Sequence, residues 1–131
     1  MTDELRFDDQ VAVITGAGGG LGKQYALLLA ARGARVVVND TGGSMTGGGA
    51  NTEVAHAVAE EIRQRGGQAV ADTHSVTSPE GGTAIIDAAL RAWGRADIVI
   101  NNAGIVGDAP FEDMTAERLE PLLDVHVEGA F

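Results

Sequence analysis

The chain has 131 residues, 44% of them apolar and 21% charged, a composition that is ordinary for a single globular domain. Its 19 acidic and 9 basic residues give a net charge of −10, which disfavours binding to nucleic acid or anionic membrane surfaces. The absence of cysteine excludes disulfides, thiol nucleophiles and thiolate metal sites, and no metal-ligand cluster stands out. We see neither a secretory signal nor an apolar run approaching the ~20 residues of a membrane span, and expect a cytoplasmic protein.

The first predicted element is a strand over about residues 10–15, which leads through a glycine-rich turn into a helix over about residues 20–32. The strand is a continuous β-branched apolar run, as in buried parallel sheets. The helical pattern that follows contains Leu21, Tyr25, Leu28, Leu29 and Arg32. Glycines allow positive φ and close approach of the backbone to a ligand, and a helix start offers unpaired N–H groups to a pyrophosphate. The alternative is a glycine-rich turn without a ligand.

The second predicted strand, residues 35–39, ends at Asp40, 18 residues after Gly22. In a dinucleotide-binding fold a carboxylate at this place accepts hydrogen bonds from the adenosine ribose and repels a 2′-phosphate, so the sequence favours NAD over NADP. The alternative is an ordinary strand-end acid that caps a turn into Gly42. The glycine-rich segment that follows, residues 41–50, is expected to be a mobile surface loop, with a direct ligand role as the less favoured alternative.

The remaining predicted elements continue the alternation of strand and helix. Asn51 or Thr52 caps a helix that Gly66 ends, residues 68–71 form a strand, and Ser78 caps a helix that runs to Trp93. Residues 97–100 form the fourth strand, and a last helix starts near residue 115. The residues expected on the packed faces of the last two helices are Ile86, Ala89, Leu90 and Trp93, and Leu119, Leu122, Leu123, His126 and Val127. This order predicts an α/β fold with one domain over residues 1–131.

Two motifs carry a resemblance to a known family. Thr15-Gly16-x-x-x-Gly20-x-Gly22 and Asn101-Asn102-Ala103-Gly104 resemble the cofactor signature and the fourth-strand motif of the short-chain dehydrogenase/reductase family. The glycine run also satisfies the T-G-x-x-G-x-x-G pattern of the extended, epimerase-like branch, but the NNAG run favours the ordinary branch. Leu5-Arg6-Phe7-Asp8 and Val38-Asn39-Asp40 further resemble the (3R)-hydroxyacyl-CoA dehydrogenase domain of peroxisomal multifunctional enzymes and their bacterial relatives.

The resemblance implies a Rossmann-type doubly wound parallel sheet with strand order 3-2-1-4, whose remaining strands would lie beyond Phe131. The NAD(P)-binding domain over residues 1–131 would then be incomplete at its C-terminal end. It also implies an NAD-dependent enzyme that interconverts a secondary alcohol and a ketone, with a 3-hydroxyacyl-CoA substrate as the narrower form, and a homodimer or homotetramer. The cofactor-binding positions that it implies are Gly16, Gly18, Gly20, Leu21, Gly22, Asp40, Ser75, Val76, Asn102, Ala103 and Gly104. Ser75 stands where the family usually has an aspartate.

The family's catalytic serine and Tyr-x-x-x-Lys pair are not in this sequence. Tyr25 is the only tyrosine and Lys23 the only lysine, and neither has the required partner. His126 holds the place of the family's relay asparagine, where it would either relay protons or be a buried structural histidine. His56 and His74 are expected at the surface without partners. We therefore expect the chain alone to have no dehydrogenase activity.

Two other classes remain open from the sequence. One is a non-catalytic nucleotide-binding or interaction module that keeps half of the fold, although it would leave the edge of the fourth strand exposed. The other is an S-adenosylmethionine-dependent methyltransferase, which also places a glycine turn and a strand-end acid around an adenosine. The NNAG run has no role in a methyltransferase, so this class is the least favoured.

Overall fold

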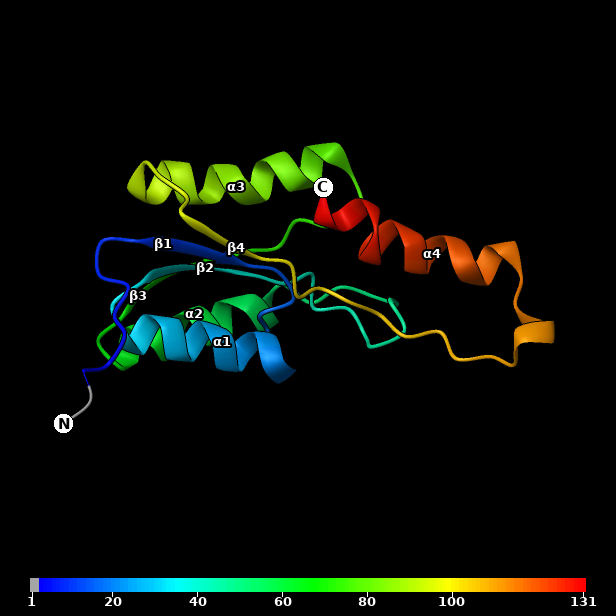
Figure 1. The fold of residues 1–131 in the computed structure, drawn as a ribbon, viewed down its shortest axis with the longest axis horizontal. Coiled ribbons are helices and arrows are strands. Elements are labelled where there is room, and N and C mark those ends of the chain that lie inside the picture. Colours follow the sequence, from blue (N-terminus) through cyan, green and yellow to red (C-terminus); the bar gives the residue numbers. More distant parts are fainter. Residues whose placement is uncertain (1–2) are drawn as a thin grey trace.

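A computed structural model describes residues 3–131 as a four-stranded parallel sheet with helices on both faces. The strand order is β3-β2-β1-β4, so the predicted fold and strand order are confirmed. Figure 1 shows α1 and α2 on one face of the sheet, α3 on the other, and α4 extending away beyond the ends of the strands. The elements are β1 (Val11–Ile14), α1 (Gly20–Ala31), β2 (Arg35–Asn39), α2 (Glu53–Gln64), β3 (Gln68–Asp72), α3 (Pro79–Trp93), β4 (Ile98–Ile100), the short 3-10 helix η1 (Phe111–Asp113), α4 (Ala116–His126) and the 3-10 helix η2 (Glu128–Ala130).

The core lies on both faces of β1 and β2. All four residues of β1 are fully buried, as expected for a central strand of continuous apolar residues. Ile14, Val36 and Val38 pack towards α1 and α2, while Val13 and Val37 pack towards α3. Because all pairings are parallel, the carboxyl ends of the strands meet at one edge of the sheet, where the glycine turn begins.

Small residues form the packed face of α1. Its buried residues are Gly22, Ala26 and Ala30, while Leu21, Tyr25 and Leu28 are exposed. Leu29, from the predicted pattern, is half-buried against the core. Small side chains let the helix lie close to the sheet, whereas the large side chains on the opposite side are too bulky for that contact. The large residues of the predicted helical pattern therefore lie mostly on the exposed side of α1.

The predictions for α3 are confirmed at its start and wrong at one position on its packed face. The Ser78 hydroxyl accepts a hydrogen bond from the Gly81 N–H at 3.0 Å, and Pro79 begins the helix. Ile85 and Ala89 are buried, Ile86 and Trp93 pack against them, and Leu90 is 46% exposed. At the start of α2, the side-chain oxygen of Asn51 accepts from the Glu53 N–H, whereas Thr52 makes no capping hydrogen bond.

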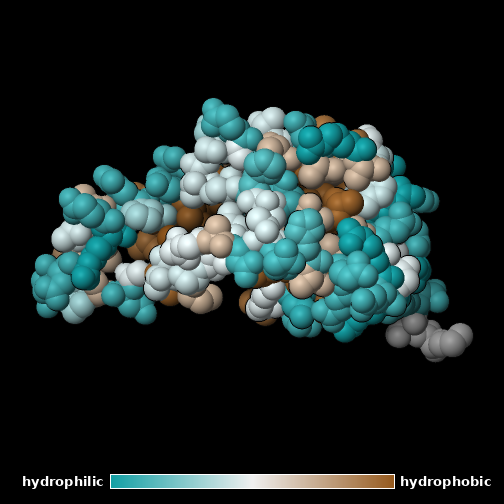
Figure 2. All heavy atoms as spheres, turned by 180° about the vertical axis from the view of Figure 1, so that it is seen from behind, coloured by the Kyte–Doolittle hydropathy of each residue, from teal (hydrophilic) through white to brown (hydrophobic). Residues whose placement is uncertain are grey.

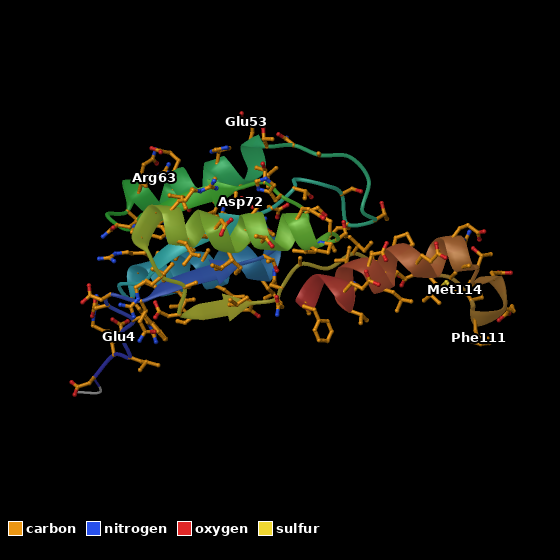
Figure 3. The ribbon with its side chains drawn as sticks, turned by 90° about the horizontal axis from the view of Figure 1, so that it is seen from above. Glu4, Glu53, Arg63, Asp72, Phe111 and Met114 are labelled. Carbon is orange, nitrogen blue, oxygen red and sulfur yellow. The ribbon has the colours of Figure 1, made fainter. Side chains whose placement is uncertain are left out.

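Helix α4 has no buried residue in the part of the chain that the structure describes. Leu119, Leu123, His126 and Val127, predicted to face inward, are exposed, and Leu122 is partly exposed, because α4 lies beyond the sheet rather than against it. We call η1 and α4 together the arm, and Phe111 and Met114 lie at its far end (Figure 3). Figure 2 shows hydrophobic atoms at the surface of both the main body and the arm. No helix within residues 3–131 combines the length and apolar character needed to cross a membrane.

Candidate functional site

The glycine turn between β1 and α1 contains two kinds of glycine. Gly16 and Gly22 are required by close contacts: a Cβ on Gly16 would lie 2.9 Å from the Ala103 Cα, and one on Gly22 would collide with the Gly16 carbonyl and the Asn102 amide. Gly19 and Gly20 have no atom of residues 3–131 within 4 Å of such a Cβ, and Gly20 has a positive φ of 52°. The turn is therefore packed on its inner side and open at the start of α1.

Thr15 and Asn102 join the two motifs by hydrogen bonds. The Thr15 hydroxyl accepts from the N–H groups of Asn102 and Ala103 at 3.1 and 3.0 Å. The Asn102 side-chain amide donates to the carbonyl oxygens of Thr15 and Gly16, both at 3.1 Å. The sequence motif includes Thr15 without indicating a role for it. The structure shows that its hydroxyl fixes the segment after β4 against the glycine turn.

Asp40 ties the end of β2 to the same turn. One carboxylate oxygen accepts from the Gly18 N–H at 2.9 Å, and the other accepts from the Gly42 N–H at 2.7 Å. The predicted alternative, a turn into Gly42 capped by this acid, is therefore present. A carboxylate has about four acceptor sites, so two hydrogen bonds orient Asp40 and leave others for a ligand. A Cβ on Gly18 would collide with Val54 and approach Asp40, which explains the glycine at this position.

The end of β3 carries an unexpected hydrogen-bond network. The buried Asp72 carboxylate accepts from the Asn39 side-chain amide at 2.8 Å and from the His74 N–H at 3.0 Å, and its other oxygen lies 2.8 Å from the His74 ring. The expectation that His74 has no partner was wrong, because the sequence does not reveal that Asp72 is buried. The side chains of the next two residues have different surroundings. The Ser75 hydroxyl forms a hydrogen bond with the Thr77 hydroxyl, whereas Val76 packs against the core beneath α3.

His126 lies against the segment that follows β4. Its ring nitrogen Nε2 is 2.8 Å from the Ile105 carbonyl oxygen and 3.1 Å from the Ile105 nitrogen. In one tautomer the ring donates to the carbonyl, and in the other it accepts from the N–H. A Cβ on Gly104 would lie 2.9 Å from the ring, so the glycine allows this approach. His126 is exposed, so it is not the buried structural histidine that the sequence analysis offered as the alternative to a proton relay.

The lysine beside the turn is already paired. Lys23, in the first turn of α1, lies 3.1 Å from Glu61, and its hydrogen bond is the main cause that lowers the pKa of the Glu61 carboxyl. Phosphates at the turn would therefore depend on backbone N–H groups and on the helix dipole. No group of three or more potential metal ligands converges within residues 3–131.

The residues at this edge fit a dinucleotide. The start of α1 is open at Gly19 and Gly20, its first N–H groups lack helical partners, and an oriented carboxylate stands on the next strand. The sequence profile of the family described as "short chain dehydrogenase" matches residues 10–131. The chain belongs to the short-chain dehydrogenase family.

Known members of this family match nearly the whole chain. The peroxisomal hydratase-dehydrogenase-epimerase of Saccharomyces cerevisiae is 50% identical over 131 residues, which cover 100% of this chain and 14% of that protein. The peroxisomal multifunctional enzyme type 2 of Drosophila melanogaster is 49% identical over 128 residues, which cover 98% of this chain and 21% of that protein. A solved structure of a 7α-hydroxysteroid dehydrogenase, complexed with NADH and 7-oxo glycochenodeoxycholic acid, superimposes with a TM-score of 0.83 at 39% identity. The match covers 95% of this chain and 45% of that chain.

These relatives confirm the family resemblance, including the likeness to peroxisomal multifunctional enzymes. The chain spans only 14% and 21% of the lengths of the two curated relatives. Of the predicted cofactor positions, the structure brings together the glycine turn, Asp40 and the Asn102–Gly104 segment. Leu21 projects outward from the first turn of α1, with 67% of its surface exposed.

Proposed function

We propose that this chain is the NAD-binding part of a short-chain oxidoreductase that interconverts a secondary alcohol and a ketone. In this proposal Gly16, Gly20 and Gly22 hold the pyrophosphate, and Leu21 lies beside it at the start of α1. Gly18 borders the cofactor and orients Asp40 through its N–H, and Asp40 holds the adenosine ribose. Ser75 and Val76 lie near the adenine, and Asn102, Ala103 and Gly104 border the rest of the cofactor. The nicotinamide supplies hydride transfer when it is bound.

The hydrogen bonds of Asp40 carry this proposal. The Gly18 and Gly42 N–H groups hold the carboxylate between the phosphate turn and the end of β2. A carboxylate fixed beside the phosphate-binding turn can accept hydrogen bonds from the two hydroxyls of the adenosine ribose, and it repels a phosphate on the 2′ position. This arrangement supports NAD rather than NADP.

Ligand binding by calorimetry tests the proposal with NAD, NADP and S-adenosylmethionine. We expect NAD to bind at least about tenfold more tightly than NADP, because hydrogen bonds to a charged group contribute roughly 1.5–3 kcal/mol. Asp40→Ser should reduce that preference, whereas Asp113→Ser, in η1, should not change it. Preferential binding of S-adenosylmethionine, or equal binding of NAD and NADP by the wild-type chain, would contradict the proposal.

Catalysis by the chain alone is not part of the proposal. The reaction needs a proton donor and acceptor beside the hydride path, and the sequence contains no Tyr-x-x-x-Lys pair. We expect no NADH formation from NAD and a 3-hydroxyacyl-CoA, the substrate class suggested by the multifunctional relatives. Turnover by the 131 residues would contradict this expectation. We propose His126 as a proton relay in the whole protein, positioned through the Ile105 main chain.

A non-catalytic nucleotide-binding module remains the alternative, since it would use the same turn and the same carboxylate. The discriminating measurement is NADH formation by the whole protein, because a module would bind NAD without turnover.

A homodimer or homotetramer stays a prediction, which sedimentation velocity would check. The cytoplasmic location also stays a prediction, and the names of the two curated relatives describe them as peroxisomal.

A further inference from the structure

Residues 41–51, which we call the strap, form a self-tied loop between β2 and α2. The Asn51 N–H donates to the Thr41 carbonyl at 2.9 Å and closes the neck of the loop. Within it, the Ser44 N–H donates to the Gly48 carbonyl at 2.8 Å, and the Ser44 hydroxyl accepts from the Gly48 N–H at 3.1 Å. The strap therefore has a defined shape of its own, which its glycine-rich sequence did not predict.

The tip of the strap rests on the segment that follows β4. The Val106 N–H donates to the Met45 carbonyl at 2.8 Å, and a Cβ on Gly47 would lie 3.2 Å from the Ile105 Cδ1. Figure 1 shows the strap beside this segment, beyond the ends of the strands. Ile105 is also the residue whose main chain bonds with His126.

The base and the tip of the strap contact segments that follow different strands. The base begins after Asp40, which directly follows β2 and accepts a hydrogen bond from the Gly42 N–H. The tip rests on Ile105 and Val106, after β4. Because β1 lies between β2 and β4 in the sheet, the strap crosses the end of β1, where the glycine turn starts. A Cβ on Gly19 or Gly20, in this turn, would meet no atom of residues 3–131 within 4 Å.

We propose that the strap closes over the dinucleotide site and must leave Ile105 and Val106 for the cofactor to enter or leave. This inference rests on the proposed function. The strap meets these residues through the main-chain hydrogen bond from Val106 to Met45 and through Gly47 against Ile105, and neither contact belongs to the sheet, so the strap can be released without unfolding it. The loss of one such hydrogen bond corresponds to a change of roughly two- to tenfold in an equilibrium or a rate.

A disulfide between the strap and its resting place tests this inference. The chain has no cysteine, so Met45→Cys with Val106→Cys introduces only one pair of thiols. The 2.8 Å hydrogen bond from the Val106 N–H to the Met45 carbonyl places the two main chains side by side, and a disulfide needs Cα atoms about 4.4–6.8 Å apart. We expect oxidation to slow NADH dissociation, measured by stopped-flow fluorescence, by at least about tenfold relative to the reduced protein. Dithiothreitol should reverse the effect, and neither single variant should respond to oxidation.

A shortened strap gives the opposite test. Deletion of residues 44–48 keeps the neck and removes the tip, so NADH should dissociate roughly two- to tenfold faster. Thr46→Ala is the matched control, because it removes only a hydroxyl contact with Ser44 and keeps the Met45 carbonyl.

The outcomes separate this inference from the proposed function. If the disulfide fails to form in the folded double variant, or forms without altering NADH exchange, the inference is overturned while NADH binding still supports the proposed function. An unchanged dissociation rate in the shortened strap would likewise overturn it. If the wild-type chain binds no NADH, the proposed function fails and the inference fails with it.

Discussion

At the scale of single residues, the glycines of this chain fall into groups with different physical roles. Gly22 lies where α1 passes over the glycine turn, so a side chain there would collide with main chain and with Asn102. At Gly82, in α3, a Cβ would have no atom of residues 3–131 within 4 Å, and the backbone is that of an ordinary helix. Substitution by alanine should therefore act in opposite directions at the two sites.

We predict that Gly22→Ala lowers the free energy of unfolding by about 1–3 kcal/mol, the usual cost of overpacking. It should also weaken NAD binding, because the Asn102 amide must leave the Thr15 and Gly16 carbonyls. Urea denaturation and calorimetry measure the two effects. Gly82→Ala is the control and should be neutral or stabilising by up to about 1 kcal/mol, since alanine favours the helix. Equal losses in both variants would refute the packing explanation for Gly22.

Asp97 gives a prediction about pH. Its carboxylate accepts from Arg95 and from the Val11 N–H at 2.8 Å, at the opposite edge of the sheet from the glycine turn. The hydrogen bond from Arg95, followed by that from Val11, lowers the pKa of this carboxyl. Because the pKa is lower in the folded state, the stabilisation is present above the ordinary aspartate pKa of about 3.9 and is lost as the pH falls through the folded value.

We expect Asp97→Asn to be less stable than the wild type at pH ~7, with the difference shrinking as the pH falls below about 4. Urea denaturation of both proteins across this range measures the change. Asp8 and Glu61 also have lowered pKa values, but they titrate in both proteins and cancel in the comparison. A difference that does not vary with pH would mean that the ionised form of Asp97 contributes nothing to stability.

At the scale of elements, the start of α3 is a defined source of stability. The Ser78 backbone is extended, and its hydroxyl satisfies the Gly81 N–H, which has no partner within the helix. We predict that Ser78→Ala costs about 1 kcal/mol, and that Ser78→Asp, which keeps an acceptor, costs less. Thr52→Ala, at the start of α2, is the matched control, because the Thr52 hydroxyl makes no capping bond. A similar loss in both alanine variants would contradict this assignment.

The order of elements and the pairing of motifs could be predicted from the sequence because they depend on local patterns. Continuous apolar strands, glycine positions and the Ser78-Pro79 start are all visible in short stretches. The packed face of α1 could not be predicted, because Ala26 and Ala30 give little hydrophobic periodicity even though they make the contact. The partners of His74 and the hydrogen bond from Val106 to Met45 depend on tertiary structure, and no nearby residue signals them.

At the scale of the whole molecule, the charge distribution sets how an anionic cofactor approaches. The net charge is −10, and the one lysine is paired with Glu61 beside the turn. Attraction to a pyrophosphate must therefore come from the N–H groups and dipole at the start of α1, which act over a short range. Repulsion from the rest of the chain acts over the Debye length, so salt should screen the repulsion more than the attraction.

We therefore predict that NADH associates faster as the ionic strength rises. Between about 10 and 100 mM salt the Debye length falls from roughly 30 to 10 Å, and the association rate should increase about two- to fivefold. Stopped-flow fluorescence measures this rate directly. Adenosine, which is neutral, should bind with little dependence on salt and serves as the control ligand. A steep loss of NADH affinity with salt would show that cationic side chains hold the phosphates, and it would contradict a site built from backbone N–H groups.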